Sequence, residues 1–167
     1  MAYEVRLSGV RAAGRVALVD DEDYGLVMKY RWYVQEKIEP GRRPYGPYAR
    51  ASFRREGKHF MPLMHTLITG YSLVDHINHN GLDNQRSNLR SATDQESARN
   101  QRPWANGTSS YMGVSWKKKN KKWVAQITIS GYVRYLGLFT SEVEAALAYD
   151  TAARESHGEF ACLNFPD

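Results

Sequence analysis

The sequence predicts an α+β protein made of two parts in tandem, and three observations support this. A run rich in Asn, Asp and Gly, from 74 to 84, follows an apolar segment and precedes helix-start signals near Thr93. A strand pattern followed by an alanine-rich helix occupies 111 to 167, and a stretch of linker composition separates the two. Apolar periodicity distinguishes strands from helices, and clusters of turn residues mark the connections.

Composition limits the possible classes of protein. The chain has 167 residues, 42% of them apolar, which is enough for one domain or two small ones. Its net charge of +5 favours anionic partners. The single cysteine, Cys162, excludes an internal disulfide framework and a cysteine-rich zinc site. No apolar run approaches the roughly 20 residues that span a bilayer, and the N-terminus lacks a signal-peptide pattern. We therefore expect a cytoplasmic protein with no membrane partner.

The first 60 residues are predicted to form a small β-rich region. Alternating or continuous apolar residues indicate short strands at 3–7 and 15–19, and Trp32 and Tyr33 indicate another. The acids from Asp20 to Asp23 favour the first turn of a short helix. The apolar segment 61–69 fits either a strand or a buried helix.

A basic segment lies between Gly41 and Lys58. It carries six basic residues and one acid, with tyrosines and prolines among them. Arginines interleaved with aromatic residues suit a phosphate backbone, because a guanidinium group can donate two hydrogen bonds to one phosphate. A solvated hairpin with arginines on its outer face fits the same pattern.

The polar run begins with an Asp-His pair, Asp75 and His76. Asn, Asp and Gly form turns held by hydrogen bonds from side chains to the backbone, so the run is predicted to be a loop. A neutral imidazole can take a proton from water near neutral pH. A carboxylate, with a side-chain oxygen from the following helix, can hold a hard divalent cation beside a phosphodiester. Alternatively the pair only satisfies a polar loop, or His65, His76 and His79 hold a structural zinc.

This stretch resembles the HNH nuclease family with its ββα-metal site, and in particular the homing endonucleases of phages and bacteria. The resemblance rests on Asp-His, an Asn-rich loop, Leu-Asp-Asn, Ser-Asn-Leu-Arg, and Thr before a short helix. It implies that His76 is the general base, that Asn88 braces the loop, and that Asp75 binds Mg²⁺, for which Mn²⁺ substitutes. His65 matches an upstream histidine expected near the scissile phosphate.

One position departs from the family pattern. The second metal ligand, usually Asn, falls at Ser97, and Asn100, one turn further along, is the other candidate. This departure supports an alternative of another class, a sequence-specific DNA-binding regulator whose HNH unit no longer cleaves. Beside a nuclease-like site, the basic segment is expected to contact DNA through its arginines, namely Arg42, Arg43, Arg50, Arg54 and Arg55.

The segment 103–110 has linker composition, with Pro103, Gly107 and small polar residues. We therefore expect an HNH nuclease domain over 1–102, made of a β-rich region (1–60) and the HNH core (61–102). A second domain is expected over 111–167.

The second part is predicted to be a three-stranded antiparallel sheet packed on one helix. The strands are expected at 113–118, 122–129 and 132–139. In the middle strand, Trp123, Ala125, Ile127 and Ile129 would form an apolar face, and Val124, Gln126 and Thr128 the other. Ser141 and Glu144 have capping-box spacing at the start of the alanine-rich helix, whose small side chains would pack on the sheet.

This part resembles the Apetala2/ethylene-response-factor DNA-binding domain over about 55 residues. The motifs include Tyr111-Met-Gly-Val, Tyr135-Leu-Gly-Leu-Phe, Ala148-Tyr-Asp-Thr-Ala-Ala and Leu163-Asn-Phe-Pro. The resemblance implies that the sheet enters the major groove of double-stranded DNA. The contact positions of the family correspond to Ser115, Lys117, Gln126, Thr128 and Tyr135. Lys119 is expected to contact a phosphate because of its charge. A merely solvated sheet face is the alternative.

Together the two resemblances imply a site-directed, metal-dependent DNA endonuclease of the HNH homing type, a phosphodiester hydrolase with no small-molecule substrate. One active site per chain would let a monomer nick one strand, whereas a homodimer would cut both. The sequence leaves open the oligomeric state and the target.

Overall fold

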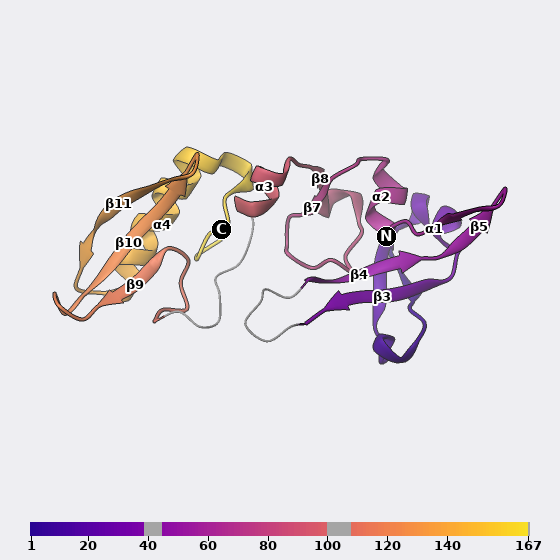
Figure 1. The fold of residues 1–167 in the computed structure, drawn as a ribbon, viewed down its shortest axis with the longest axis horizontal. Coiled ribbons are helices and arrows are strands. Elements are labelled where there is room, and N and C mark those ends of the chain that lie inside the picture. The colour runs from indigo at the N-terminus through magenta and orange to yellow at the C-terminus, as the bar shows by residue number, and fades with distance from the viewer. Residues whose placement is uncertain (39–44, 100–107, 167) are drawn as a thin grey trace. The chain divides into compact units, whose positions relative to one another are not determined.

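The computed structural model describes residues 1–38, 45–99 and 108–166. Small antiparallel sheets and short helices make it an α+β protein, as predicted (Figure 1). The chain divides into two compact units, Met1–Asp94 and Gln95–Asp167, so this division falls before the boundary expected near residue 102. Most of the predicted linker, 103–110, lies outside the described residues.

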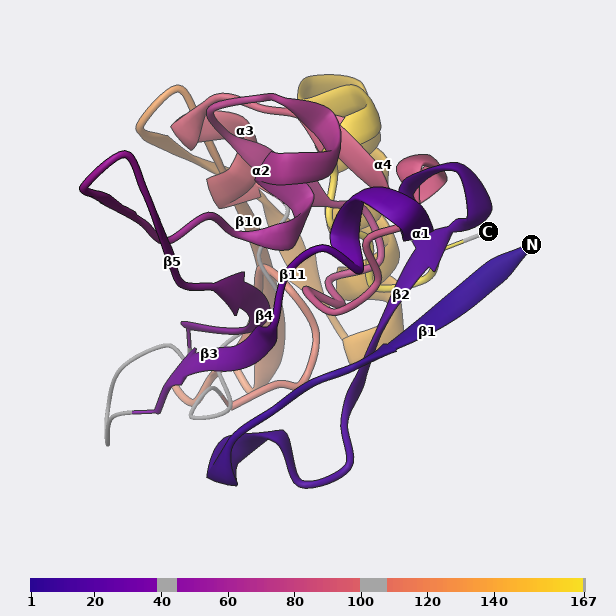
Figure 2. The ribbon, with the colours of Figure 1, turned by 90° about the vertical axis from the view of Figure 1, so that its right-hand side faces the viewer.

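The first unit opens with a hairpin that leads straight into a helix. Strand β1 (Ala2–Arg6) pairs antiparallel with β2 (Val16–Asp20), and the two run side by side in Figure 2. A 3-10 helix, η1 (Val10–Ala12), lies between them. Helix α1 (Asp21–Val27) follows with three acids in its first turn, which stabilise the positive end of the helix dipole. The prediction of a helix beginning at the acidic run is confirmed.

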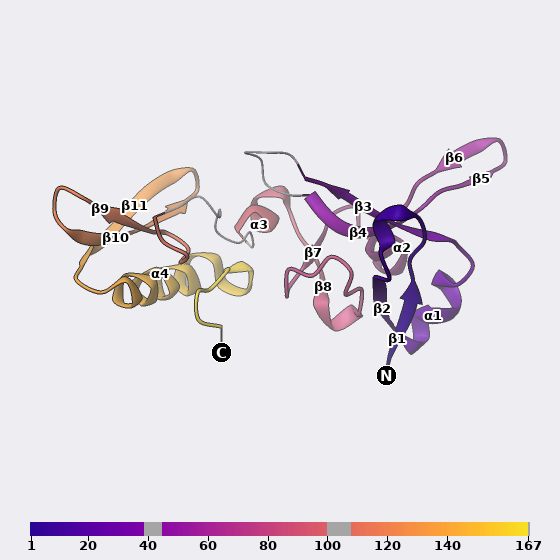
Figure 3. The same ribbon diagram turned by 90° about the horizontal axis from the view of Figure 1, so that it is seen from below.

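Two more strand pairs follow. Strand β3 (Trp32–Lys37) pairs with β4 (Tyr45–Ala51). Strands β5 (Phe53–Arg55) and β6 (Lys58–Phe60) form a hairpin that projects from the rest of the first unit (Figure 3).

The segment 61–69 contains helix α2 (Met64–Thr69), so the helical alternative is the correct one. The helix ends at Gly70, whose φ of 72° gives it a left-handed C-cap. Its Met64 is fully buried in the core of the first unit.

The core of the first unit joins its helices to its strands. Trp32 is almost completely buried, and its indole nitrogen donates to the carbonyl of Val27 at 2.8 Å. Val19 and Val27 are also fully buried in the same cluster. Burying each such side chain contributes about 1.5–3 kcal/mol, so this core fixes the positions of β2, α1 and α2.

The polar run lies between two very short strands. Strand β7 (Val74–His76) pairs antiparallel with β8 (Leu89–Ser91), which places Asp75 opposite Arg90. The 3-10 helix η2 (Arg86–Asn88) leads into β8, and helix α3 (Asp94–Arg99) follows β8 in the chain.

The second unit is a sheet covered on one face by a helix (Figure 1). Strands β9 (Val114–Lys117), β10 (Lys122–Ile129) and β11 (Tyr132–Phe139) form the predicted three-stranded antiparallel sheet, in the order β11-β10-β9. Helix α4 (Glu142–His157) begins with the predicted capping box and buries its alanines against the sheet; the 3-10 helix η3 (Gly158–Phe160) follows it.

One detail of the middle strand differs from the prediction. Val124 was assigned to the polar face, yet only 7% of it is exposed. It lies between Ser115 on β9 and Leu138 on β11, at the centre of the sheet, so its neighbours shield it. A register shift at Ala125 and Gln126 further disturbs the simple alternation of faces.

Among the described residues, no helix is long and apolar enough to cross a membrane.

Gly81 provides a test of how the polar loop packs on β4. A Cβ atom at this position would lie 2.5 Å from the Pro47 carbonyl oxygen and 2.5 Å from a ring carbon of Tyr48. We expect Gly81→Ala to lower the free energy of unfolding by about 1–3 kcal/mol, because the loop or the ring must move. Urea denaturation measures this change.

The matched control is Gly25→Ala in α1, where nothing lies within 4 Å of the added methyl group. This change is expected to raise stability by up to about 1 kcal/mol, because alanine is the better helix former. Equal effects of the two substitutions would contradict the packing described for Gly81.

Candidate active site

Three rings from three elements meet at the end of β7. The His76 ring lies 4.9 Å from the His65 ring of α2, measured between centroids, and 5.7 Å from the Tyr48 ring of β4. The Tyr48 and His65 rings are 5.5 Å apart. The structure therefore brings together the two histidines predicted for catalysis, and it adds Tyr48.

Burial keeps both imidazoles neutral. Only 6% of each histidine is exposed. Desolvation, with a smaller effect from the neighbouring His76, lowers the pKa of His65 to about 3. Desolvation also lowers the pKa of His76, while Asn84 and the carboxylates of Asp75 and Asp83 act in the opposite direction. A neutral imidazole is the form that can accept a proton.

Tyr48 is a site residue that the sequence alone did not reveal. The sequence showed it only as one aromatic residue within a basic segment. Burial raises the pKa of its phenol, so the phenol stays protonated. The ring can lie this deep because Gly81, which faces it, has no side chain.

Asp75 is nearly buried and is bound by an arginine. Both Nε and Nη2 of Arg90 donate to Asp75 Oδ2, at 2.9 and 2.7 Å. Only 12% of the Arg90 side chain and 10% of the Asp75 side chain are exposed. A buried carboxylate needs such compensation, so the position favours a cationic group beside Asp75.

Asn88 joins the two ends of the polar loop. Its Oδ1 accepts a hydrogen bond from the Asn78 backbone at 2.9 Å, and its Nδ2 donates to the Asp83 carbonyl at 2.8 Å. The Asn88 carbonyl also accepts from the backbone of Ile77 at 3.0 Å. These bonds hold the residues that follow His76 against the start of β8.

The rest of the loop is held by side-chain-to-backbone bonds, as predicted. Asn78 accepts from the backbone of Asn80 at 2.8 Å, and Asn80 in turn accepts from the backbone of Leu82 at 3.2 Å. The Asn78 amide donates to Asp83 at 2.7 Å. Short Asx turns of this kind explain why the run needs so many Asn and Asp residues.

The donor set suits a hard cation only in part. Asp75 offers carboxylate oxygen in a position that already favours positive charge. Ser97 lies half-buried in α3, within the second unit, and Asn100 falls outside the described residues. Within the ranges that the structure describes, no group of three or more His, Cys, Asp and Glu side chains could hold a metal. The zinc site considered for His65, His76 and His79 is therefore not formed; His79 is a loop residue with a φ of 62°.

The predicted DNA-contacting arginines of the first unit differ in their surroundings. Arg50 is half-buried, and its Nε donates to the Met61 carbonyl at 3.1 Å, so it also holds β4 to the segment before α2. Arg54 and Arg55 are exposed on β5, in the projecting hairpin. Arg42 and Arg43 lie outside the described residues.

The predicted DNA-contacting side chains of the second unit share an accessible surface. Gln126 lies opposite Tyr135 in the register of β10 and β11, and both are exposed. The other exposed members of the predicted set are Ser115, Lys117, Lys119 and Thr128. Helix α4 packs against the apolar side of the same sheet, which leaves these polar groups accessible.

Known proteins resemble this chain over most of its length. An uncharacterized HNH endonuclease of Acanthamoeba polyphaga mimivirus is 30% identical over 154 residues, covering 92% of this chain and 77% of the viral protein. Protein 3.8 of Escherichia phage T7 is 33% identical over 88 residues, covering 53% of this chain and 72% of the phage protein. No family model matches the chain. The first similarity is sufficient to show that the chain belongs to the HNH endonuclease family.

A plant protein supports the second resemblance. Dehydration-responsive element-binding protein 2C of Arabidopsis thaliana is 45% identical over 64 residues, which cover 37% of this chain but only 18% of the plant protein. The chain thus combines an HNH endonuclease with an Apetala2-like segment, as the two sets of motifs indicated.

The buried histidines predict how stability depends on pH. Their folded-state pKa values are lowered, so their contribution is fully present above the unfolded value of about 6.5 and is lost as pH falls toward the folded values. For His65 this interval runs from about 6.5 to about 3. Each such group contributes a slope of about 1.4 kcal/mol per pH unit.

We expect His65→Gln to reduce the loss of unfolding free energy between pH 6.5 and 4.5, measured by urea denaturation. Comparing the variant with the wild type removes the contribution of the carboxylates, which both proteins share. NMR of the imidazole protons should show His65 neutral down to pH 4, and a midpoint near 6.5 would contradict its burial.

Proposed function

We propose that the protein is a site-directed DNA endonuclease of the homing type that hydrolyses a phosphodiester with a divalent metal and a histidine base. Membership of the HNH endonuclease family supports cleavage of DNA as the general activity. The observation that carries the proposal is the buried, neutral His76 beside the Asp75 carboxylate and the Asn88-braced loop.

In this proposal His76 takes a proton from the attacking water. Its burial suits the task, because a charged imidazole could not act as a base. Asn88 keeps the loop after His76 in place through its bonds to the backbone at residues 78 and 83. His65, whose ring lies against that of His76, would lie near the scissile phosphate.

The proposed metal is Mg²⁺, with Mn²⁺ as a substitute, held by Asp75 together with Ser97 or Asn100. When bound, it would stabilise the negative charge on the leaving oxygen. Arg90 holds the Asp75 carboxylate in place beside His76. In this view β7 and β8 would be the two strands of the family's ββα unit.

We further propose that a nuclease domain (1–102) and a DNA-binding domain (111–167) are joined by a linker (103–110). The outer face of the second unit's sheet would lie in the major groove of double-stranded DNA. Gln126 is suited to read adenine there, because its amide can donate and accept at once. The arginines of the first unit would contact phosphates beside the cleaved bond.

One observation favours an alternative, a DNA-binding regulator that does not cleave. Arg90 already neutralises the Asp75 carboxylate that a metal would use. If that ion pair is permanent, the protein would bind DNA through its second unit and leave the strand intact. A single assay of plasmid nicking distinguishes the two functions, because only the endonuclease would cut the DNA.

His76→Ala tests the proposed base. We expect wild-type protein to nick plasmid DNA with Mg²⁺ or Mn²⁺ and to stop in EDTA. The variant should lose about 10²- to 10⁴-fold in rate, because general-base catalysis contributes that much. His59→Ala is the matched control, since His59 is exposed on β6 and bonded to Ser52. DNA binding without nicking under every metal would favour the regulator.

Two substitutions on the sheet separate base reading from phosphate binding. Gln126→Ala is expected to cost about 1–3 kcal/mol of binding free energy for the target alone. Lys119→Ala is expected to weaken binding to all sequences and to reduce the salt slope by about 1. Thr151→Ala, at an exposed position of α4, serves as control. Fluorescence anisotropy at several salt concentrations measures both effects; no change in either would contradict the proposed surface.

A further inference from the structure

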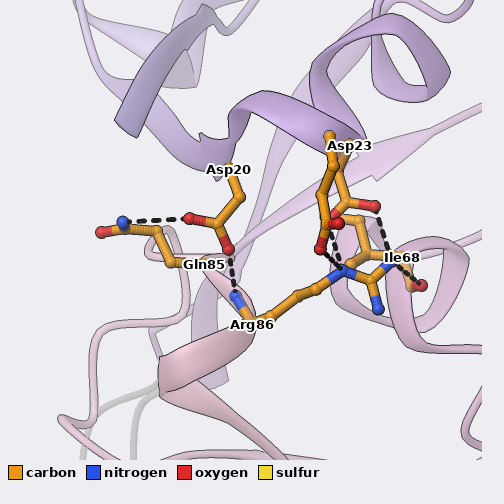
Figure 4. A network of polar contacts seen from close by, with 6 residues as sticks. Asp20, Asp23, Ile68, Gln85 and Arg86 are labelled. Atoms are coloured by element: carbon orange, nitrogen blue, oxygen red, sulfur yellow. Dashed lines mark hydrogen bonds and ion pairs between the residues drawn. The ribbon is translucent and has the colours of Figure 1, made fainter. Parts of the chain in front are cut away.

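A polar network joins α1 to the loop that follows the Asp-His pair (Figure 4). Arg86, at the start of η2, donates from Nε and Nη2 to the two carboxylate oxygens of Asp23, each at 2.8 Å. Its backbone N–H donates to Asp20 Oδ2 at 2.7 Å. The two acids stand 63 and 66 residues away from Arg86 in the chain.

The Asp23–Arg86 pair joins a buried carboxylate to a partly exposed guanidinium group, since 4% of the Asp23 side chain and 48% of the Arg86 side chain are exposed. Asp23 is 3% exposed, and its carboxylate uses both oxygens in a two-pronged contact. Exposed ion pairs contribute little, but a buried carboxylate that loses its partner is costly. Glu22, by contrast, reaches the same guanidinium group at 2.7 Å with 68% of its side chain exposed. Asp23 is therefore the partner that holds Arg86.

The backbone continues this attachment toward the histidine. Leu18 of β2 donates to the Leu82 carbonyl and accepts from the Asn84 N–H, both at 2.8 Å. The loop thus adds a short parallel bridge to β2, next to Asp83. Asn84 is completely buried, and its amide donates to the Leu82 carbonyl at 3.1 Å, so the position of this bridge determines where the Asn84 side chain lies. Asn84 acts to raise the pKa of His76, which places its side chain near the imidazole.

The attachment also reaches Asn88. Arg86 and Asn88 belong to the same 3-10 helix, and the Asn88 N–H donates to the Gln85 carbonyl at 2.9 Å. Gln85 reaches Asp20 at 3.4 Å. If Arg86 changed position, the 3-10 helix would move with it. Asn88, which braces the segment after His76, would then also change position.

We infer that Asp23 and Arg86 are positioning residues of the nuclease site: they fix the loop carrying Asn84 and Asn88 against β2 and so hold His76 in its working geometry. This inference rests on the proposed nuclease function. In this inference the N-terminal region supports catalysis indirectly, because β2 and α1 supply the surface to which the loop is attached. Neither residue touches the reacting atoms.

The test uses the full chain with three substitutions. Asp23→Asn keeps the shape and removes the charge, Arg86→Gln removes the guanidinium group, and Arg86→Lys restores the charge without the two-pronged contact. Glu22→Gln is the control, because its carboxylate is exposed and reaches the same arginine. Single-turnover nicking of plasmid DNA with Mn²⁺, DNA affinity and backbone amide exchange are measured for each.

We expect Asp23→Asn and Arg86→Gln to lower the single-turnover rate by about 10- to 100-fold, because small displacements of catalytic groups cost that much. DNA affinity should change by less than about twofold, because the DNA-contacting side chains proposed on the sheet belong to the second unit, whereas Asp23 and Arg86 belong to the first. Amides of Asn78, Asn84 and Asn88 should exchange at least about tenfold faster, whereas Ile127 in β10 should not change. Arg86→Lys should recover part of the rate, and Glu22→Gln should match the wild type.

A folded Asp23→Asn variant with wild-type nicking would overturn the inference, as would unchanged exchange at Asn84. If Arg86→Gln does not fold, Arg86→Lys and Asp23→Asn still decide the matter. Absence of metal-dependent nicking in the wild type would instead reject the proposed function. In that case amide exchange alone decides whether the pair fixes the loop.

Discussion

The main-chain bridge between β2 and the polar loop is the contact on which the site depends. Two hydrogen bonds of 2.8 Å, made by Leu18 to residues 82 and 84, attach a segment with almost no regular structure to the core of the first unit. A loop of Asn, Asp and Gly has little apolar surface to bury, so its position must come from hydrogen bonds. The bridge transfers the rigidity of a packed strand to the residues around His76.

The electrostatics of the site follow from the same burial. Two imidazoles and a tyrosine ring lie together in an interior where charge is poorly solvated, so both histidines remain neutral. One carboxylate, Asp75, is kept beside them and has a cationic partner in Arg90. The two groups therefore differ in charge although they are neighbours. Burial keeps the His76 imidazole neutral, as a base must be, while the Asp75 carboxylate stays ionised beside its cationic partner.

Local sequence signals predicted local structure well. The acids before α1, the Ser141–Glu144 capping box and the Asx turns of the loop each act over three or four residues, and each is observed. The three antiparallel strands of the second unit were predicted from turn residues and alternation.

Contacts between distant segments could not be predicted in this way. The pairing of Arg86 with Asp23 joins residues 63 positions apart, and nothing in the local composition of either segment indicates it. Tyr48 joins the site because a strand 28 positions earlier in the chain, β4, packs against the end of β7, and because Gly81 leaves room for its ring. Segment 61–69 was ambiguous because a helix of six residues is too short for periodicity to identify. For the candidate site, the sequence thus indicated the chemistry of Asp75 and His76 and, through the family resemblance, the brace at Asn88. It did not indicate Tyr48 or the Asp23–Arg86 pair.

The ion pair between Asp75 and Arg90 affects both candidate functions, because a buried carboxylate needs a positive partner. A carboxylate taken out of water is unfavourable unless a cation compensates it, and the guanidinium group meets that need through two short hydrogen bonds to one oxygen. A doubly charged ion offers stronger compensation at the same distance, because the attraction scales with charge. A metal at this position would therefore have to displace the guanidinium group or share the carboxylate with it. The ion pair shows that the buried Asp75 carboxylate requires a positive partner, a condition that a metal-assisted hydrolase and a decayed descendant of one would share. The difference between them lies in whether the buried imidazole next to that charge still receives a proton from water.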